Sequence, residues 1–203
     1  AATRSLVIAS GSTITSSGAV DLTGTDLLQT AGNIVTNAAG ATVTFNSATT
    51  LAGGITVNTT SGVPAGSNIV FIGAVTGSGM ALGLTAGTGG NIAFGGQVGV
   101  SGTELGAVTI NSANNVAGDT GATLNAGAIY AANLVQTTGA GVTRLGVVRT
   151  TAASPLGVNV TAHQIQANGT ITTVGGGIVT LHATIGAATR SLVIASGSTI
   201  TSS

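Results

Sequence analysis

Residues 43–58 read VTFNSATTLAGGITVN, and this stretch carries the pattern that recurs through the whole chain. The phrase apolar-Thr-apolar-Asn stands at both of its ends, at residues 43–46 and 55–58. In an extended strand successive side chains point to opposite faces, so the two apolar residues share one face and Thr lies on the other. The alternation predicts short, half-buried strands, and the Ser, Ala and Gly residues between them predict turns.

The same pattern returns at intervals that suit a repeated coil. The phrase recurs as VTIN at 108–111, ATLN at 122–125 and VTLH at 179–182, and NIVF at 68–71 recurs as NIAF at 91–94. Short strands repeated with a period of about 20–25 residues indicate a solenoid. The phrases at 43 and 55 are only about half such a period apart, which indicates that more than one strand of each coil uses the phrase.

We therefore predict an all-β fold, a parallel β-helix (β-solenoid). The 34 glycines and the many β-branched residues disfavour helices. The interior is expected to hold only Val, Ile, Leu, Ala and Gly, stacked in columns. The Asn of the phrase is expected at corners, in the left-handed conformation and with its amide bonded to neighbouring backbone. Pro64 and Pro155 are expected in loops that leave the coil.

The two ends of the sequence are identical. Residues 1–17 read AATRSLVIASGSTITSS, and residues 187–203 read the same. We interpret residues 1–186 as one full unit of a tandem array, with about eight or nine coils, and residues 187–203 as the start of the next unit. At about 4.8 Å per coil one unit would be about 40 Å long. Two alternatives stay open: an artificial overlap of the ends, and a flanking repeat that brackets a unique domain.

In a tandem array each unit would cover the open sheet edge of the unit before it. The expected partners are therefore identical units, joined end to end, with lateral bundling of the resulting fibres as a further option. Arg4 and its copy Arg190 lie near the expected junction. They are candidates for an ion pair with an acid at that place.

The composition excludes several classes of function. Charged residues are 4% of the chain, the net charge is zero, and there is no Lys or Cys. Binding to nucleic acid needs clustered Lys and Arg, so it is excluded. Zinc–thiolate and disulfide chemistry need cysteine. Apolar residues make up 43% of the chain, which argues against disorder, yet no apolar run is long enough for a transmembrane helix.

Candidate sites are few. The acids are Asp21, Asp26, Glu104 and Asp119, and only the first two are close in sequence. Two carboxylates with nearby carbonyls suit calcium, so Asp21 and Asp26 are the one metal candidate. No catalytic or cofactor-binding residue is assigned, because clustered acids with a base are missing. We therefore expect no enzymatic activity and, apart from calcium, no cofactor.

The remaining ionisable residues are interpreted as surface residues or members of ion pairs and not as a functional site. His163 and His182 are separated by close to one coil length and could stack on one face, but two histidines make a poor metal site. Arg144 and Arg149 should point to opposite faces of a continuous strand unless a turn intervenes. We expect them to be solvated or paired with an acid on a neighbouring coil.

Three segments carry a resemblance to a known group: GNIAFGGQVGV (90–100), LGAVTINSANN (105–115) and ATLNAGAIYAANL (122–134). In style they resemble the long β-strand-repeat surface proteins of bacteria, the filamentous-haemagglutinin-type adhesins and autotransporter passenger repeats. The resemblance implies a right-handed parallel β-helix that is secreted to the cell surface. It also implies a structural or adhesive role as a repeat unit of a long extracellular fibre.

Three alternatives remain at this stage. Thr-x-Thr motifs at residues 13–15, 42–44 and 170–172 would suit an ice-binding face if they formed a ladder. A carbohydrate-active β-helix is the second alternative, although acids and aromatic residues are scarce. A cross-β amyloid fibre is the third, given the low charge and high β-propensity.

Overall fold

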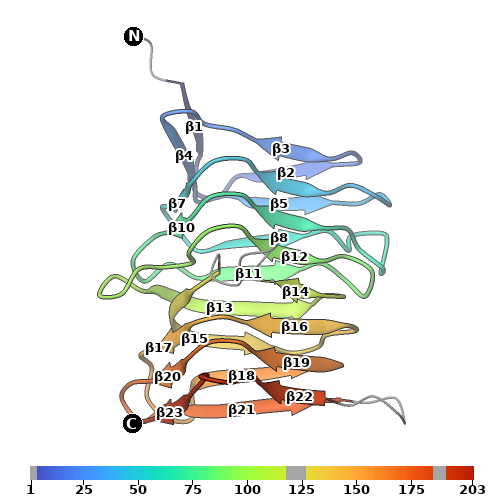
Figure 1. Ribbon diagram of the computed structural model, residues 1–203. Helices are drawn as coiled ribbons and strands as arrows, with labels where there is room; N and C mark the ends of the chain where they lie inside the picture. Colours follow the sequence, from blue (N-terminus) through green and yellow to red (C-terminus); the bar gives the residue numbers. More distant parts are fainter. Residues whose placement is uncertain (1–3, 118–126, 185–190) are drawn as a thin grey trace.

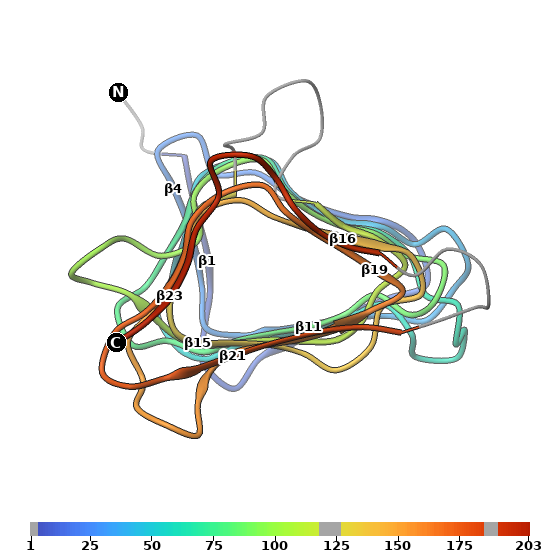
Figure 2. The same ribbon diagram turned by 60° about the horizontal axis from the view of Figure 1, so that its bottom comes forward.

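The computed structural model describes residues 4–117, 127–184 and 191–203. The chain winds as a β-solenoid of about eight coils, and every pairing between its strands is parallel (Figure 1). Viewed close to the axis, the coils form a triangle whose three sides are stacks of strands (Figure 2). The described residues contain no helix, and hence none that could cross a membrane. The predicted all-β parallel solenoid is confirmed.

We number the sides in the order in which the chain meets them. Side 1 is continuous because Val98 bridges Val75 on one coil and Ile129 on the next. Its strands, in order along the axis, are β1 (Ser5–Ile8), β4 (Leu27–Thr30), β7 (Thr49–Leu51), β10 (Val75–Thr76), the first half of β15 (Ile129–Gln136), β17 (Val148–Thr150), β20 (Ile171–Thr173) and β23 (Ile200–Ser202).

Side 2 contains the longest strands. Strand β15 turns the corner between the sides, so that residues 129–131 pair with side 1 and residues 134–136 pair with side 2. The strands of side 2 are β2 (Thr13–Ser16), β5 (Asn33–Thr36), β8 (Ile55–Asn58), β11 (Leu82–Thr85), β13 (Leu105–Ser112), the second half of β15, β18 (Gly157–Ala162) and β21 (Ile178–Ala183).

Side 3 shows that the short sequence repeat is one coil. Ile69 lies opposite Ile92 and Phe71 opposite Phe94, the pairing that the recurrence of NIVF as NIAF predicts. The strands of side 3 are β3 (Val20–Leu22), β6 (Val43–Phe45), β9 (Ile69–Phe71), β12 (Ile92–Phe94), β14 (Val116–Ala117), β16 (Val142–Leu145), β19 (Gln164–Ala167) and β22 (Ser191–Ile194).

The apolar-Thr-apolar-Asn phrase is shared between sides, as its uneven spacing predicts. The copy at 43–46 forms β6 on side 3, whereas the copies at 55–58, 108–111 and 179–182 lie on side 2. In β6 the two apolar residues are buried and Thr44 is half-buried on the outer surface. The copy at 122–125 lies outside the described residues.

The core is a set of aliphatic columns with one aromatic stack. On side 2, for example, Val57, Leu84 and Ile110 lie directly above one another on successive coils and are buried. On side 3, Phe45, Phe71 and Phe94 are stacked inside the solenoid with ring centroids 4.3 and 5.6 Å apart. The expectation that the interior holds only small aliphatic residues is therefore wrong, since facing rings on adjacent coils fill the space together.

The corners are built differently from the expectation for Asn. No described residue other than glycine has a positive φ, so the predicted left-handed Asn is wrong, and glycines such as Gly11 (φ +78°) make these turns. The second expectation, that the Asn amide of the phrase bonds neighbouring backbone, is confirmed for Asn58, whose Oδ1 accepts a hydrogen bond from the backbone N–H of Thr60 at 2.8 Å. Asn46 and Asn111 instead donate to the hydroxyls of Thr23 and Thr85 on the preceding coil.

Inward-facing threonines close several corners from within. The hydroxyl of Thr36 donates to the carbonyl oxygen of Ala41 at 2.8 Å, and that of Thr59 donates to the carbonyl oxygen of Ser67 at 2.7 Å. Both threonines are fully buried. A buried hydroxyl without a partner would cost about 1–3 kcal/mol, so these bonds offset the cost of placing Thr36 and Thr59 inside an otherwise apolar column.

Candidate functional site

The outer surface of side 3 is hollowed where its outward side chains become short. Val70, Ala93, Ala117 and Arg144 follow one another on successive coils. Because two of the four are alanines, a groove of about 470 Å³ lies between the longer side chains. We call it the Asn groove; its lining is Asn68, Val70, Asn91, Ile92, Ala93, Asn115, Ala117 and Arg144.

A row of asparagines forms one wall of the Asn groove. The backbone N–H of Asn91 donates to Oδ1 of Asn68 at 2.8 Å, and the backbone N–H of Asn115 donates to Oδ1 of Asn91 at 3.1 Å. The backbone N–H of Val142 donates to Oδ1 of Asn115 at 2.8 Å. Each amide therefore satisfies the first backbone donor of side 3 on the following coil, which fixes the row along the axis.

Arg144 supplies the only charge in the lining of the Asn groove. Its Nε–H donates to Oε1 of Gln166 on the next coil at 3.0 Å, which holds the guanidinium against side 3. The groove thus offers an apolar floor, neutral amides and one cation. Such a lining can hold a hydroxyl-bearing or anionic group, but with no carboxylate or histidine among its residues it offers no acid–base pair.

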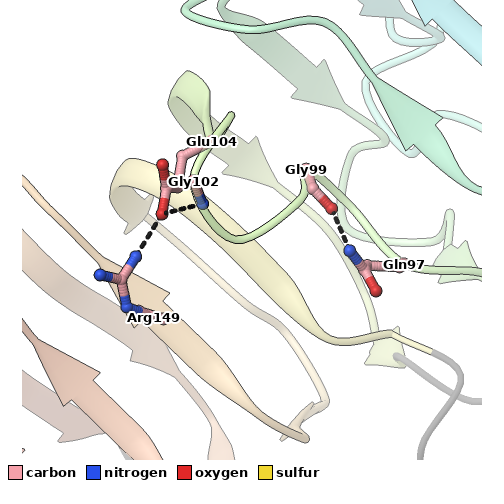
Figure 3. Close-up of polar contacts among 5 residues, drawn as sticks. All are labelled: Gln97, Gly99, Gly102, Glu104 and Arg149. Atoms are coloured by element: carbon pink, nitrogen blue, oxygen red, sulfur yellow. Dashed lines mark hydrogen bonds and ion pairs between the residues drawn. The ribbon is translucent and has the colours of Figure 1, made fainter.

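A second polar cluster lies on side 1, where a loop at residues 99–104 leaves the coil (Figure 3). Glu104 forms an ion pair with Arg149 of β17, and its Oε1 accepts a hydrogen bond from the backbone N–H of Gly102 at 3.0 Å. Hydrogen bonds from the backbone N–H groups of Gly102 and of Glu104 itself, aided by the charge of Arg149, lower the pKa of Glu104 below its ordinary value of 4.5.

The base of that loop is held tightly against the next coil. The Gln97 amide donates to the carbonyl oxygen of Gly99 at 2.6 Å (Figure 3). Gly99 has φ +73°, and a Cβ there would lie 1.9 Å from the carbonyl oxygen of Tyr130. Only glycine fits this position, so the loop begins at a fixed point and brings Glu104 to Arg149 reproducibly.

The two candidate calcium ligands lie on β3 and on the corner that follows it. Asp21 is on the outer surface of β3, and Asp26 lies at the following corner, where one carboxylate oxygen accepts a hydrogen bond from the backbone N–H of Arg4 at 2.6 Å. Within the described ranges no group of three or more His, Asp or Glu side chains gathers as a metal site would require. Asp119 lies outside those ranges.

The junction candidates are described only in part. Arg4 meets Asp26 through its backbone, as above, and the backbone N–H of Asp26 donates back to the carbonyl oxygen of Arg4 at 3.4 Å. Arg190 lies outside the described residues. A side-chain ion pair at the junction therefore stays a prediction.

The remaining ionisable residues are dispersed. Arg144 and Arg149 lie on sides 3 and 1, because a corner intervenes between β16 and β17. Arg149 pairs with an acid, as predicted, but Glu104 lies two coils away in the strand register and not on the neighbouring coil. His182 on β21 is exposed and lies opposite Thr161 rather than His163, so the two histidines do not stack.

The Asn groove was not predicted from the sequence, although a signal for it exists. The asparagines at 68, 91 and 115 recur at intervals of one coil, and the outward residue two positions later shrinks from Val70 to Ala93 and Ala117.

Comparison with known proteins finds no matching family model, no matching curated protein and no matching solved structure.

Proposed function

We propose that this chain is a structural and adhesive repeat unit of a long extracellular bacterial fibre, in which units stack end to end. The solenoid supplies length and stiffness. Its outer surface has few charges, and its binding features would be repeated once in every unit. The style of the sequence, which resembles bacterial surface repeats, supports the extracellular placement.

The observation that carries the proposal is that residues 191–203, which repeat residues 5–17, continue the solenoid as a further coil. The inward-facing residues of the last coil, Leu192 and Ile194, are 45% and 50% exposed, although their partners in the coil below are fully buried. Ile8, the sequence equivalent of Ile194 in the first copy, is only 7% exposed because the next coil covers it. The same apolar residue is covered by a following coil in one copy and uncovered in the other, which favours the addition of further coils after residues 191–203.

The adhesive part of the proposal rests on the Asn groove and on the projecting loops. Loops at 99–104 and 151–156, the latter containing Pro155, stand outside the triangle (Figure 2). Loops on a rigid scaffold are where binding residues are commonly found. In a fibre, each of these features would be repeated once per unit, and weak contacts made many times over yield strong attachment.

The structure does not favour the alternatives. The three Thr-x-Thr motifs fall at β2, β6 and β20, one on each side of the triangle, so they do not form the single flat ladder that an ice-binding face needs. Glycoside hydrolysis generally uses two neighbouring carboxylates. Glu104 instead forms an ion pair with Arg149, and the lining of the Asn groove contains no acid.

Electron microscopy of the native assembly tests the proposal. We expect thin filaments in which each unit adds about 40 Å of length, at about 4.8 Å per coil. Antibodies against the loop at 151–156 should label the filaments on intact cells. Compact single particles without end-to-end contacts, or label only inside the cell, would overturn the proposal.

A further inference from the structure

The duplicated segment has the same local structure in both copies. Residues 5–16 form strand, corner, strand, and residues 191–202 do the same. At the corner the backbone N–H of Ser12 donates to the carbonyl oxygen of Ala9, and that of Ser198 donates to the carbonyl oxygen of Ala195, at 3.3 and 3.0 Å. The alternation is also kept, since Leu6 and Leu192 both face inward above or below a buried partner.

The two copies nevertheless occupy different sides of the triangle. In the first copy the strands are β1 on side 1 and β2 on side 2. In the second copy the same residues are β22 on side 3 and β23 on side 1. The corner that joins sides 1 and 2 in one copy therefore joins sides 3 and 1 in the other.

Both strands give the same count along the axis. From β1 on the first coil to β22 on the eighth, and from β2 on the first coil to β23 on the ninth, the chain passes through seven coils and two further sides. Coil length varies, since the coil from Ile129 to Val148 is short and the coil from Val98 to Ile129 is much longer, and the 186 residues of one copy do not fill a whole number of coils.

We propose that consecutive copies in the array advance by seven coils and two sides, so that each copy is turned by one side relative to the copy before it. The inference rests on the proposed tandem array and adds its geometry. At about 4.8 Å per coil the advance is about 37 Å per copy, and three copies, about 110 Å, restore the original orientation.

In the proposed array the junction leaves no open sheet edge, because the two copies pair through opposite edges of the same strand. In the first copy the strand is paired through one edge, where Leu6 lies opposite Leu28. In the second copy it is paired through the other edge, where Leu192 lies opposite Ile165. Joined in one strand, these pairings give a continuous inward column with leucine between Ile165 and Leu28. Ile14 and Ile200 do the same between Ile34 and Ile171.

The consequence for the fibre is a surface that is displayed all round. The Asn groove lies on side 3 of its own unit, so in the next unit it would lie on a neighbouring side. A partner approaching from any direction would meet one groove in every three units. Units stacked in phase would instead place all grooves in one line.

Cysteine cross-linking tests the proposed turn, because the chain has no cysteine of its own. Directly opposed residues on adjacent strands lie about 4.7–4.9 Å apart, within disulfide range. The pair Gln166→Cys with Val193→Cys is opposed in the observed register, whereas stacking in phase would oppose Thr172 to Val193. The pairs are compared under mild oxidation, first in the 203-residue chain and then in a protein with two complete copies of residues 1–186.

We expect the 166/193 pair to cross-link in both proteins and the 172/193 pair in neither. Cross-linking of 172/193 in the two-copy protein would overturn the proposed turn and leave the end-to-end fibre intact. If neither pair cross-links in a two-copy protein whose circular dichroism shows full β-content, the copies do not form one solenoid. That result would overturn the end-to-end stacking of the proposed function as well.

Discussion

The phenylalanine stack contains the three largest fully buried side chains of the described residues. Phe71 is the central ring, with Phe45 on one side and Phe94 on the other, and the planes of each pair are within 12° and 18° of parallel. All three are at most 1% exposed. Removing the central ring therefore takes away two ring contacts and leaves a cavity that the backbone ladders above and below prevent from collapsing.

We expect Phe71→Ala to lower the free energy of unfolding by about 3–5 kcal/mol, the usual cost of deleting a buried aromatic ring. Urea unfolding followed by circular dichroism measures this loss. Val70→Ala is the matched control, since Val70 is next in the strand but faces outward into the Asn groove. Its cost should stay within about 0.5 kcal/mol. Equal losses for both variants would mean that the stack contributes nothing of its own.

Glu104 makes the stability of the loop depend on pH. Because its pKa is lowered in the folded protein, its contribution is fully present above the ordinary pKa of 4.5 and disappears as pH falls through the lowered folded value. Glu104→Gln should cost about 1 kcal/mol at pH 7, and its stability should converge with that of the unsubstituted protein as the pH falls below 4.5 and through the lowered folded pKa of Glu104. Thermal unfolding at a series of pH values checks the convergence; a constant difference would rule out this role.

The Asn row links one coil to the next along the start of side 3. Asn91 accepts from the backbone N–H of Asn115, whereas Asn46 at the end of side 3 only donates to the hydroxyl of Thr23 at 3.2 Å. Asn91→Ala leaves a half-buried backbone donor without its protein partner, and we expect a loss of about 1–2 kcal/mol. Asn46→Ala should change stability by a few tenths of a kcal/mol. Hydrogen exchange at the Asn115 amide, faster only in the first variant, would locate the effect.

The coil and its strands could be predicted from the sequence because both follow local rules. Alternation assigns inward and outward residues, and the recurrence of the segment at Asn68 as the segment at Asn91 sets the coil that the register of Ile69 and Ile92 confirms. The pairing of Glu104 with Arg149 could not be predicted in the same way. The two residues are 45 positions apart, and the long coil between Val98 and Ile129 breaks any fixed period.

The aromatic stack and the Asn groove show a second limit of sequence patterns. Phe45, Phe71 and Phe94 become a single stack only because two coils of unequal length place them on the same side in the same register. The groove depends on the same alignment of Ala93 with Ala117. The position of each feature depends on the lengths of the coils between its residues, and these lengths are unequal. The side on which residues 191–203 lie depends on the lengths of all the preceding coils.

The solenoid as a whole is a one-dimensional stack, so its ends are its weakest parts. Backbone pairing joins each coil to its two neighbours, and the stability of the array is set by the interfaces between coils. On the last coil, Val193 and Ile194 are adjacent residues with 41% and 50% exposure. They differ in direction: Val193 lies opposite the outward Gln166, and Ile194 lies opposite the buried Ala167.

Substitutions at Val193 and Ile194 distinguish a junction, where a following coil covers the strand, from a free end, where none does. In a two-copy protein Ile194 would be covered by the following coil, as Ile8 is covered in the first copy at 7% exposure, whereas Val193 would stay on the surface. Ile194→Lys would then bury an unpaired charge and should disrupt the fold of the two-copy solenoid at residues 187–203, so that a protease cleaves there. Val193→Lys should leave the fold intact. Limited proteolysis followed by mass spectrometry locates the cleavage site. In the 203-residue chain both residues are exposed, so both variants should keep the stability of the unsubstituted protein within about 0.5 kcal/mol. Equal resistance of the two variants in the two-copy protein would show that no coil covers Ile194 and that the copies do not join.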